Sequence, residues 1–534
     1  MNLRTRVRMR SKPCLATADL PGYLTACCKR IEYDGRCSGD LKFEQRRRIE
    51  MKRIRMIGSK GISPMNLRPV RIHRFANTAL AVALYSGMVS CGHSGNSCLL
   101  CTTSTVRLFA YVVNNGSGNV SAYSVDTASG ALAAVPGSPF AAGTSPTSVT
   151  LVTSSNVAFT SFPEETVQFA YVVNRTSQSV SAYSIDAASG ALTTLPGSPY
   201  ATDSGPVSMT VVTGFGSTVV EPTGQSTLAN AGNFAYILNH DSDNISAYAI
   251  DATKGTFVPV PGSPFAAGSG PVALTIAGHF AYVLDNGGDS VSAYSVDTAT
   301  GALSPVPGSP FATGSGPISL ALPNTSGAAT YVYVANSGSG DISAYLLDAT
   351  SGALTPVAGS PFPAGSKPVA VAVGGGFAYV LNQGSNNISA YVIDFSTGTL
   401  AAVPGSPFAV GANPVQLTYP GFVYAVNAGS NSVSAFSVSS AGALVPLPGS
   451  PYATGSQPAG LTAFASGMQV TPSGHQYFAL VPNGGSNNVS AYTLDAPGGQ
   501  FNGALSAVSG SPFAAGTSPD SAAAITTTVT VPGN

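Results

Sequence analysis

The chain of 534 residues carries few charges and no tryptophan, and its charges are unevenly placed. Charged residues make up 9% of it, and 19 of the 23 lysines and arginines lie before residue 75. From there on it has four basic and 17 acidic side chains. Duplex DNA and anionic membrane surfaces need a basic patch that displaces their counterions. We therefore expect no nucleic acid among the partners, and membrane contact only through an N-terminal lipid anchor.

Cysteine is absent after residue 101, so disulfides do not hold the later part of the chain together. The seven cysteines are Cys14, Cys27, Cys28, Cys37, Cys91, Cys98 and Cys101. The last two have C-x-x-C spacing, but redox activity of that motif needs a helix N-terminus in a βαβ setting. The sequence offers no such setting, so we interpret them as a local disulfide or as idle thiols.

Residues 1–64 are rich in arginine and show no sustained apolar periodicity, which makes them poor core material. We interpret them as a basic, low-order extension upstream of the true start at Met65. A nucleic-acid-binding arm and a metal site are the alternatives. The cysteines of this segment lack the paired spacing of a zinc site.

Residues 65–90 have the parts of a signal peptide: a basic start, an apolar stretch and a small residue, Ser90, before Cys91. The apolar stretch is shorter than the roughly 20 residues of a membrane helix. The segment resembles a bacterial lipoprotein signal, although Met88 stands where leucine is usual. That resemblance implies lipidation at Cys91, a tether over residues 91–105 and export to the bacterial cell envelope. An ordinary secretory signal is the alternative and also implies export.

Eight copies of one unit fill residues 106–534. Each has a Ser-Ala-Tyr or Ser-Ala-Phe core followed by a Gly-Ser-Pro-Phe or Gly-Ser-Pro-Tyr tag, and the core serines are Ser121, Ser181, Ser246, Ser292, Ser343, Ser389, Ser434 and Ser490. The closest spacing, about 45 residues, is that of a propeller blade. Each unit contains four apolar runs between turn residues, which indicates short antiparallel strands.

The pattern therefore predicts an all-β fold, a β-propeller of four-stranded blades. Eight blades are expected, and seven blades with one odd copy are the alternative. The first copy lacks the strand that precedes the tyrosine run in the others, whereas residues from Ser518 onward supply an extra one. We predict that this C-terminal strand pairs beside Phe109 and closes the ring.

One face of such a ring carries the polar loops between second and third strands. They contain Asp241, Asp243, Asp285, Asp289 and Asp341. Calcium is the candidate ion there, because hard cations prefer several oxygen ligands. The alternative is ordinary turn chemistry, and without a D-x-D-x-D-G loop we expect neither a metal nor another cofactor. The opposite face collects three long insertions, at residues 154–168, 213–232 and 465–476.

A hydrolase needs a positioned base, a nucleophile or a metal. Only His240, His279 and His475 remain after residue 105, and they fall in different copies without a shared motif. They are the catalytic candidates. The remaining basic residues are scattered along the sequence, which disfavours a phosphorylated substrate.

The runs Tyr111–Asn114, Tyr171–Asn174 and Tyr379–Asn382, each followed by a Ser-Ala-Tyr strand, resemble the YVTN-type β-propeller repeat. That family overlaps the lactonase-like propellers related to 6-phosphogluconolactonase, which usually have seven blades. The resemblance implies lactone ring opening as one activity. From the near-identical copies we favour an exported, lipid-anchored, monomeric binding or scaffold module for a glycan, peptide or protein. The alternative is a lactonase-like hydrolase that uses a carboxylate or histidine at the mouth of the central channel.

Overall fold

The computed structural model describes residues 102–153, 167–213, 218–220, 226–228, 232–322, 330–419, 421–465, 477–495 and 501–532. These residues form strands and turns and no helix, so none of them forms a helix that could span a membrane. The expected extension, signal peptide and lipidated Cys91 lie outside the described residues, as do most of the three insertions.

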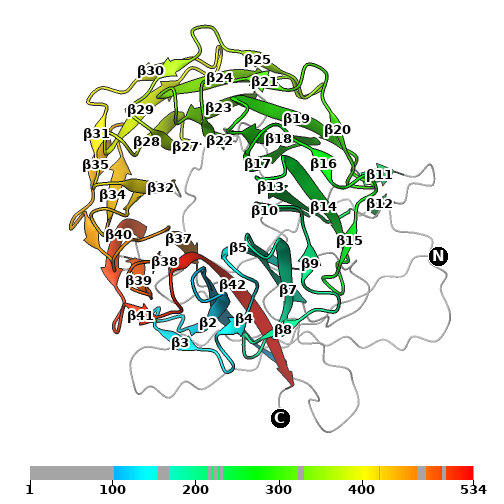
Figure 1. Ribbon diagram of the computed structural model, residues 1–534. Coiled ribbons are helices and arrows are strands. Elements are labelled where there is room, and N and C mark those ends of the chain that lie inside the picture. Colours follow the sequence, from blue (N-terminus) through cyan, green and yellow to red (C-terminus); the bar gives the residue numbers. More distant parts are fainter. Residues whose placement is uncertain are drawn as a thin grey trace, which may run out of the picture. The chain divides into compact units, whose positions relative to one another are not determined.

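Eight sheets form a ring of blades, which confirms the eight-bladed propeller (Figure 1). Each blade has an inner, a second, a third and an outer strand, all antiparallel, and a two-residue strand from the Gly-Ser-Pro tag also pairs with the third strand. We number the blades 1 to 8 in the order of their second strands.

The strands of blades 1 to 4, inner strand first and tag strand last, are β42 (Pro519–Pro532), β1 (Thr102–Asn114), β2 (Asn119–Val125), β3 (Leu132–Ala134) and β4 (Phe140–Ala141); β5 (Pro146–Thr153), β6 (Gln168–Asn174), β7 (Ser179–Ile185), β8 (Leu192–Thr194) and β9 (Tyr200–Ala201); β10 (Pro206–Val212), β13 (Phe234–Asn239), β14 (Asn244–Ile250), β15 (Phe257–Pro259) and β16 (Phe265–Ala266); β17 (Pro271–Ala277), β18 (Phe280–Asp285), β19 (Ser290–Val296), β20 (Leu303–Pro305) and β21 (Phe311–Ala312). A separate hairpin of β11 (Thr218–Val220) and β12 (Ser226–Leu228) lies in the blade 3 insertion.

The strands of blades 5 to 8, in the same order, are β22 (Pro317–Ala321), β23 (Thr330–Asn336), β24 (Asp341–Leu347), β25 (Leu354–Pro356) and β26 (Phe362–Pro363); β27 (Pro368–Gly374), β28 (Phe377–Asn382), β29 (Asn387–Ile393), β30 (Leu400–Ala402) and β31 (Phe408–Ala409); β32 (Pro414–Thr418), β33 (Val423–Asn427), β34 (Ser432–Val438), β35 (Leu444–Pro446) and β36 (Tyr452–Ala453); β37 (Thr462–Ala465), β38 (Tyr477–Asn483), β39 (Asn488–Asp495), β40 (Phe501–Ala507) and β41 (Phe513–Ala514).

The ring closes without a covalent bond, as expected from the sequence. β42 from the C-terminal end pairs with β1 from Thr102 opposite Pro532 to Asn114 opposite Pro519, with one register shift between Val113 and Asn114. Figure 1 shows the C-terminal strand lying in the same blade as the first strands of the chain. Closure of this kind leaves no large unpaired sheet edge between the two ends.

The cores lie between blades. All seven residues of β6 are buried, because both faces of the strand pack against a neighbouring sheet. The tag has a structural role, since its serine hydroxyl accepts a hydrogen bond from a third-strand amide in each blade, as Ser138 does from Ala122 at 2.9 Å. The aspartate at the end of the third strand holds its turn: Asp126 accepts backbone hydrogen bonds from Ala128 and Ser129.

Candidate functional site

The loops between second and third strands and the loops between blades lie at the same ends of the strands, and we call this side of the ring the loop face. Here the residue after each second strand donates its amide to the loop that enters the blade, as His240 does to Gly205 at 2.9 Å. Because that loop leads directly into the inner strand, these residues surround the axis of the ring.

The loop face brings together Arg175, His240 and Asp241. His240 Nδ1 lies 2.7 Å from Asp241 Oδ1, and Arg175 Nη2 lies 3.5 Å from the same oxygen. Their side chains are between about a third and a half exposed. The hydrogen bond with His240 lowers the pKa of Asp241, and the nearby Arg175 lowers it further. The carboxylate is therefore ionised across the neutral range, and it can accept a hydrogen bond from a protonated Nδ1 of His240.

The free side of the imidazole faces the next blade. A β-carbon on Gly270 would lie 3.3 Å from His240 Nε2, so the glycine leaves the ring nitrogen room. In the sequence Arg175 is one of a few scattered basic residues. In the structure it lies in blade 2, next to the blade of His240, and its guanidinium reaches Asp241. A histidine oriented by a carboxylate and accompanied by a guanidinium is a set that can accept a proton and stabilise an anion.

Asp243 and Asp289 support the backbone of the loop face. Both adopt positive φ, and their carboxylates accept 2.7 Å hydrogen bonds from the amides of Gly270 and Gly316 respectively. Asn386, Asn431 and Asn487 hold the next loop in the same way from equivalent positions. The carboxylates of these two aspartates therefore link consecutive blades through hydrogen bonds and are not free.

Asp285 and Asp341 are also committed to internal hydrogen bonds. Asp285 is fully buried and accepts bonds from the Gly268 amide and from the hydroxyls of Ser290 and Ser292. Burial raises its pKa, while these bonds act in the opposite direction. Asp341 accepts a 2.7 Å bond from the side-chain amide of Asn336. Of the five aspartates, only Asp241 joins a charged cluster.

The other candidates lie apart from this cluster. His279 is in the turn between β17 and β18, at the strand ends opposite the loop face, and its carbonyl accepts a hydrogen bond from Val296. His475 is outside the described residues. Within the described part of the chain, no three histidine, cysteine or acidic side chains gather as metal ligands, so the calcium alternative has no ligand set there.

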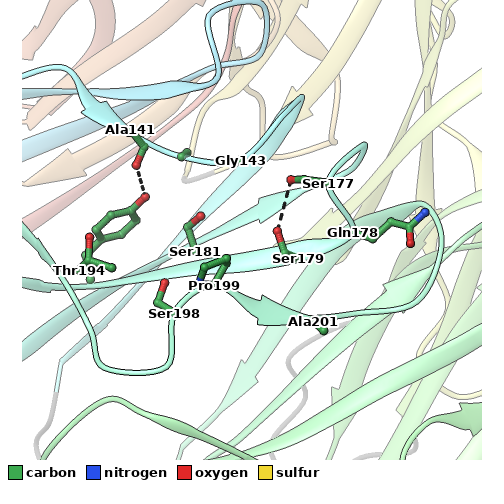
Figure 2. A pocket seen from close by; sticks show the side chains of 12 residues that line it. Ala141, Gly143, Ser177, Gln178, Ser179, Ser181, Thr194, Ser198, Pro199 and Ala201 are labelled. Carbon is green, nitrogen blue, oxygen red and sulfur yellow. Dashed lines mark hydrogen bonds between the residues drawn. The ribbon is translucent and has the colours of Figure 1, made fainter.

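A groove lies between the end of blade 1 and blade 2, along the third strand β7 (Figure 2). Its twelve lining residues include no charged side chain, and their polar groups are mostly hydroxyls: Ser177, Ser179, Ser181, Tyr183, Thr194 and Ser198. The Tyr183 hydroxyl already donates to the Ala141 carbonyl at 2.5 Å. The groove can therefore hydrogen-bond a neutral ligand, but it contains no group that could act as a base near neutral pH.

The fold and the charged cluster define the class of the protein, a closed β-propeller with an asymmetric polar site on one face. A family model described as "Lactonase, 7-bladed beta-propeller" matches residues 102–305, 225–418 and 271–459, which together make up more than half of the chain. The chain belongs to this lactonase β-propeller family, although its ring has eight blades.

Similar solved structures include a candidate 6-phosphogluconolactonase from Bacteroides uniformis, which is 14% identical over 78% of this chain and 99% of that chain, with a TM-score of 0.46. The periplasmic gluconolactonase PpgL of Pseudomonas aeruginosa is 16% identical over 79% of this chain and 99% of that chain, with a TM-score of 0.44. Identities of this size do not carry an activity from one protein to another. Comparison with curated proteins finds no match.

Proposed function

We propose that the protein is a lactonase, a hydrolase that opens the ring ester of a sugar lactone. Membership of the lactonase β-propeller family supports a lactonase-type activity. The 2.7 Å contact between His240 and Asp241 is the observation that supports a reaction on the loop face.

In the proposed reaction His240 Nε2 accepts a proton from a water molecule as the water oxygen attacks the lactone carbonyl. Asp241 holds the imidazole in the required tautomer and stabilises its charged form. The negative charge that develops on the carbonyl oxygen is stabilised by Arg175. The bond between the carbonyl carbon and the ring oxygen then breaks, the ring oxygen takes the proton from His240, and an open-chain hydroxy acid leaves.

The scarcity of cations favours a neutral lactone over its phosphate ester. In the described residues the basic side chains of the loop face near this site are Arg175 and His240, and both already face Asp241. A phosphate group needs uncommitted donors and positive charge. We expect D-glucono-1,5-lactone to be opened faster than its 6-phosphate.

The test is hydrolysis of a lactone panel at constant pH, corrected for spontaneous opening. His240→Ala should lower kcat about 100-fold or more, the typical contribution of a general base. His279→Ala is the matched control and should leave kcat unchanged. Absence of turnover by the wild-type protein, or equal rates for both alanine variants, would refute the assignment.

A non-catalytic glycan-binding module is the second candidate. The uncharged hydroxyl groove between blades 1 and 2 supports it, because neutral sugars are bound through hydrogen bonds of this kind. Binding of an oligosaccharide array without any lactone turnover would favour this function.

Export with a lipid anchor is a further part of the proposal. A lipidated Cys91 would leave an N-terminal tether before β1. Radiolabelled palmitate should be incorporated by the wild-type chain and not by Cys91→Ser. Labelling of neither protein would exclude the anchor.

A further inference from the structure

The first residues of the inner strands can be compared across all eight blades. In blades 1 to 7 the inner strand begins at a buried proline, and in blade 8 the equivalent Pro458 forms an isolated bridge ahead of β37. The residue after this proline is partly exposed in every blade. Seven of these residues carry no charge: Thr147, Val207, Val272, Ile318, Val369, Val415 and Ala459. The eighth is Asp520 in β42, the one ionisable residue among the described residues of the inner strands.

Asp520 stands at a β-bulge. Pro519 pairs with Asn114, but Ser521 pairs with the adjacent Val113, so Asp520 is the extra residue on its strand. The same shift follows the proline in blades 2 to 7. Bulges re-aim a side chain and are common beside functional sites.

The bulge turns two consecutive side chains toward the next blade. In blade 4, Val272 and Ala273 both pack into the core that blades 4 and 5 share. In blade 6, Val369 and Ala370 do the same toward blade 7. By the same register, Asp520 and Ser521 bring a carboxyl and a hydroxyl to the edge of the interface between blades 1 and 2. A serine also stands second in the pairs of blades 2, 3 and 5, so the carboxyl is the feature peculiar to blade 1.

Neither of these polar groups is matched by the protein. The Ser521 hydroxyl is buried and has no hydrogen-bond partner among the described residues. Burial raises the pKa of Asp520, and no described donor or cation offsets that effect. Unpaired buried polar groups destabilise a fold, so a pair that apolar residues could replace needs another explanation.

We propose that Asp520 and Ser521 form a binding site for the hydroxyl groups of a neutral polyhydroxyl compound at the axial edge of the loop face. A carboxylate can accept hydrogen bonds from two adjacent hydroxyls, and a serine can donate or accept another. The described inner strands contain no basic residue, which disfavours an anionic ligand. The site rests on the proposed lactonase activity only for the identification of its ligand as a sugar lactone.

The substitution Asp520→Val tests the site, because valine stands at this position in blades 3, 4, 6 and 7. D-sorbitol, a stable neutral polyol, serves as the probe in calorimetric titration of the full protein. We expect Asp520→Val to weaken sorbitol binding at least about tenfold, as the loss of a charge-assisted hydrogen bond does. Thr147→Val, at the equivalent position of blade 2, is the matched control and should bind sorbitol like the wild type.

Thermal unfolding separates binding from folding. Asp520→Val should melt at or above the temperature of the wild-type protein, since it restores the apolar residue of the other blades. Unchanged sorbitol binding in Asp520→Val, no binding to the wild type, or a lower melting temperature of the variant would each overturn the proposal.

Lactone kinetics keep this site distinct from the proposed activity. If the wild type opens lactones, Asp520→Val should raise KM and leave kcat largely unchanged, unlike His240→Ala. Sorbitol binding that depends on Asp520 without any turnover would retain the site and reject the lactonase. Turnover that depends on His240, with sorbitol binding and KM unaffected by Asp520→Val, would retain the lactonase and reject the site.

Discussion

The phenol hydroxyl of Tyr424 in blade 7 donates a 2.7 Å hydrogen bond to the carbonyl oxygen of Gly503 in blade 8. The same bond joins the earlier blades in turn, from Tyr111, Tyr171, Tyr236, Tyr282, Tyr333 and Tyr379. In blade 8 the equivalent residue is Leu480, which has no hydroxyl to offer blade 1. The second-strand tyrosines thus join seven of the eight junctions, whereas at the junction of blades 8 and 1 the hydroxyl of the third-strand Tyr123 donates to the Ala514 carbonyl.

We expect Tyr424→Phe to lower the free energy of unfolding by about 1 kcal/mol, because it leaves the Gly503 carbonyl without this buried donor. Chemical denaturation measures the change.

The converse variant is Phe436→Tyr. Third-strand tyrosines such as Tyr391 reach back to the preceding blade, to the Pro363 carbonyl at 2.5 Å, and Phe436 is the residue without that hydroxyl. The variant Phe436→Tyr should therefore stabilise the protein. A loss of stability in both variants would contradict a stabilising role of the tyrosine hydrogen bonds between blades.

Removal of residues 520–534 should abolish cooperative unfolding. The deletion takes away nearly all of β42, so blade 1 loses its inner strand and β1 becomes an exposed edge. Circular dichroism during heating measures the cooperativity. Deletion of residues 533 and 534 alone is the control, and an unchanged melt of the longer deletion would show that β42 does not close the ring.

Asp285→Asn should stabilise the protein increasingly as the pH rises. Burial raises the folded-state pKa of Asp285 above its ordinary value, so its protonated form is favoured by folding. The stability that wild type owes to this group is present below the unfolded pKa and is lost as the pH rises through the folded pKa. Asparagine fits the position, since Asn382 makes the equivalent bonds in blade 6.

Melting temperatures of wild type and Asp285→Asn at about pH 3 and pH 8 test this difference, which should be larger at the higher pH. The reverse change, Asn382→Asp, should destabilise the protein at pH 8. A variant Asp285→Asn that loses stability at pH 8 would show that the carboxylate itself is required.

Asp241→Asn should lower kcat for lactone opening about tenfold or more at pH 8. The hydrogen bond with His240 and the nearby Arg175 lower the pKa of Asp241, so the wild-type carboxylate is ionised at this pH and can stabilise the imidazole, whereas the amide of asparagine is neutral. Initial rates of the two proteins at pH 8 measure the difference. Equal rates would show that the reaction does not need the carboxylate.

The repeats made the fold predictable. Their spacing predicts the blades, and the extra strand after Ser518 predicts the closure that β42 and β1 make. The site was less predictable, because Arg175 and Asp241 are distant in sequence and meet only through the packing of adjacent blades. Asp243 resembles a free loop acid in the sequence. The asparagines at the same place in later copies were the available signal that it holds a turn.

Asp520 could have been found from the sequence alone. Aligning the eight copies at their prolines places it in a column of valine, isoleucine, threonine and alanine. Its partial burial and its place at a bulge could not be read there, since they depend on the register of β42 against β1.

Closure by β42 also explains how an eight-bladed chain can belong to a family described by seven blades. The pairing of β1 with β42 joins the first and last strands of the propeller, and its contacts are the same whatever number of units lies between them. Duplication of one internal unit in the gene therefore adds a whole blade, and the pairing of β42 with β1 still closes the ring. The packing between blades must adjust to the new number of blades. The candidate site on blades 2 and 3 is then retained although the blade number changes.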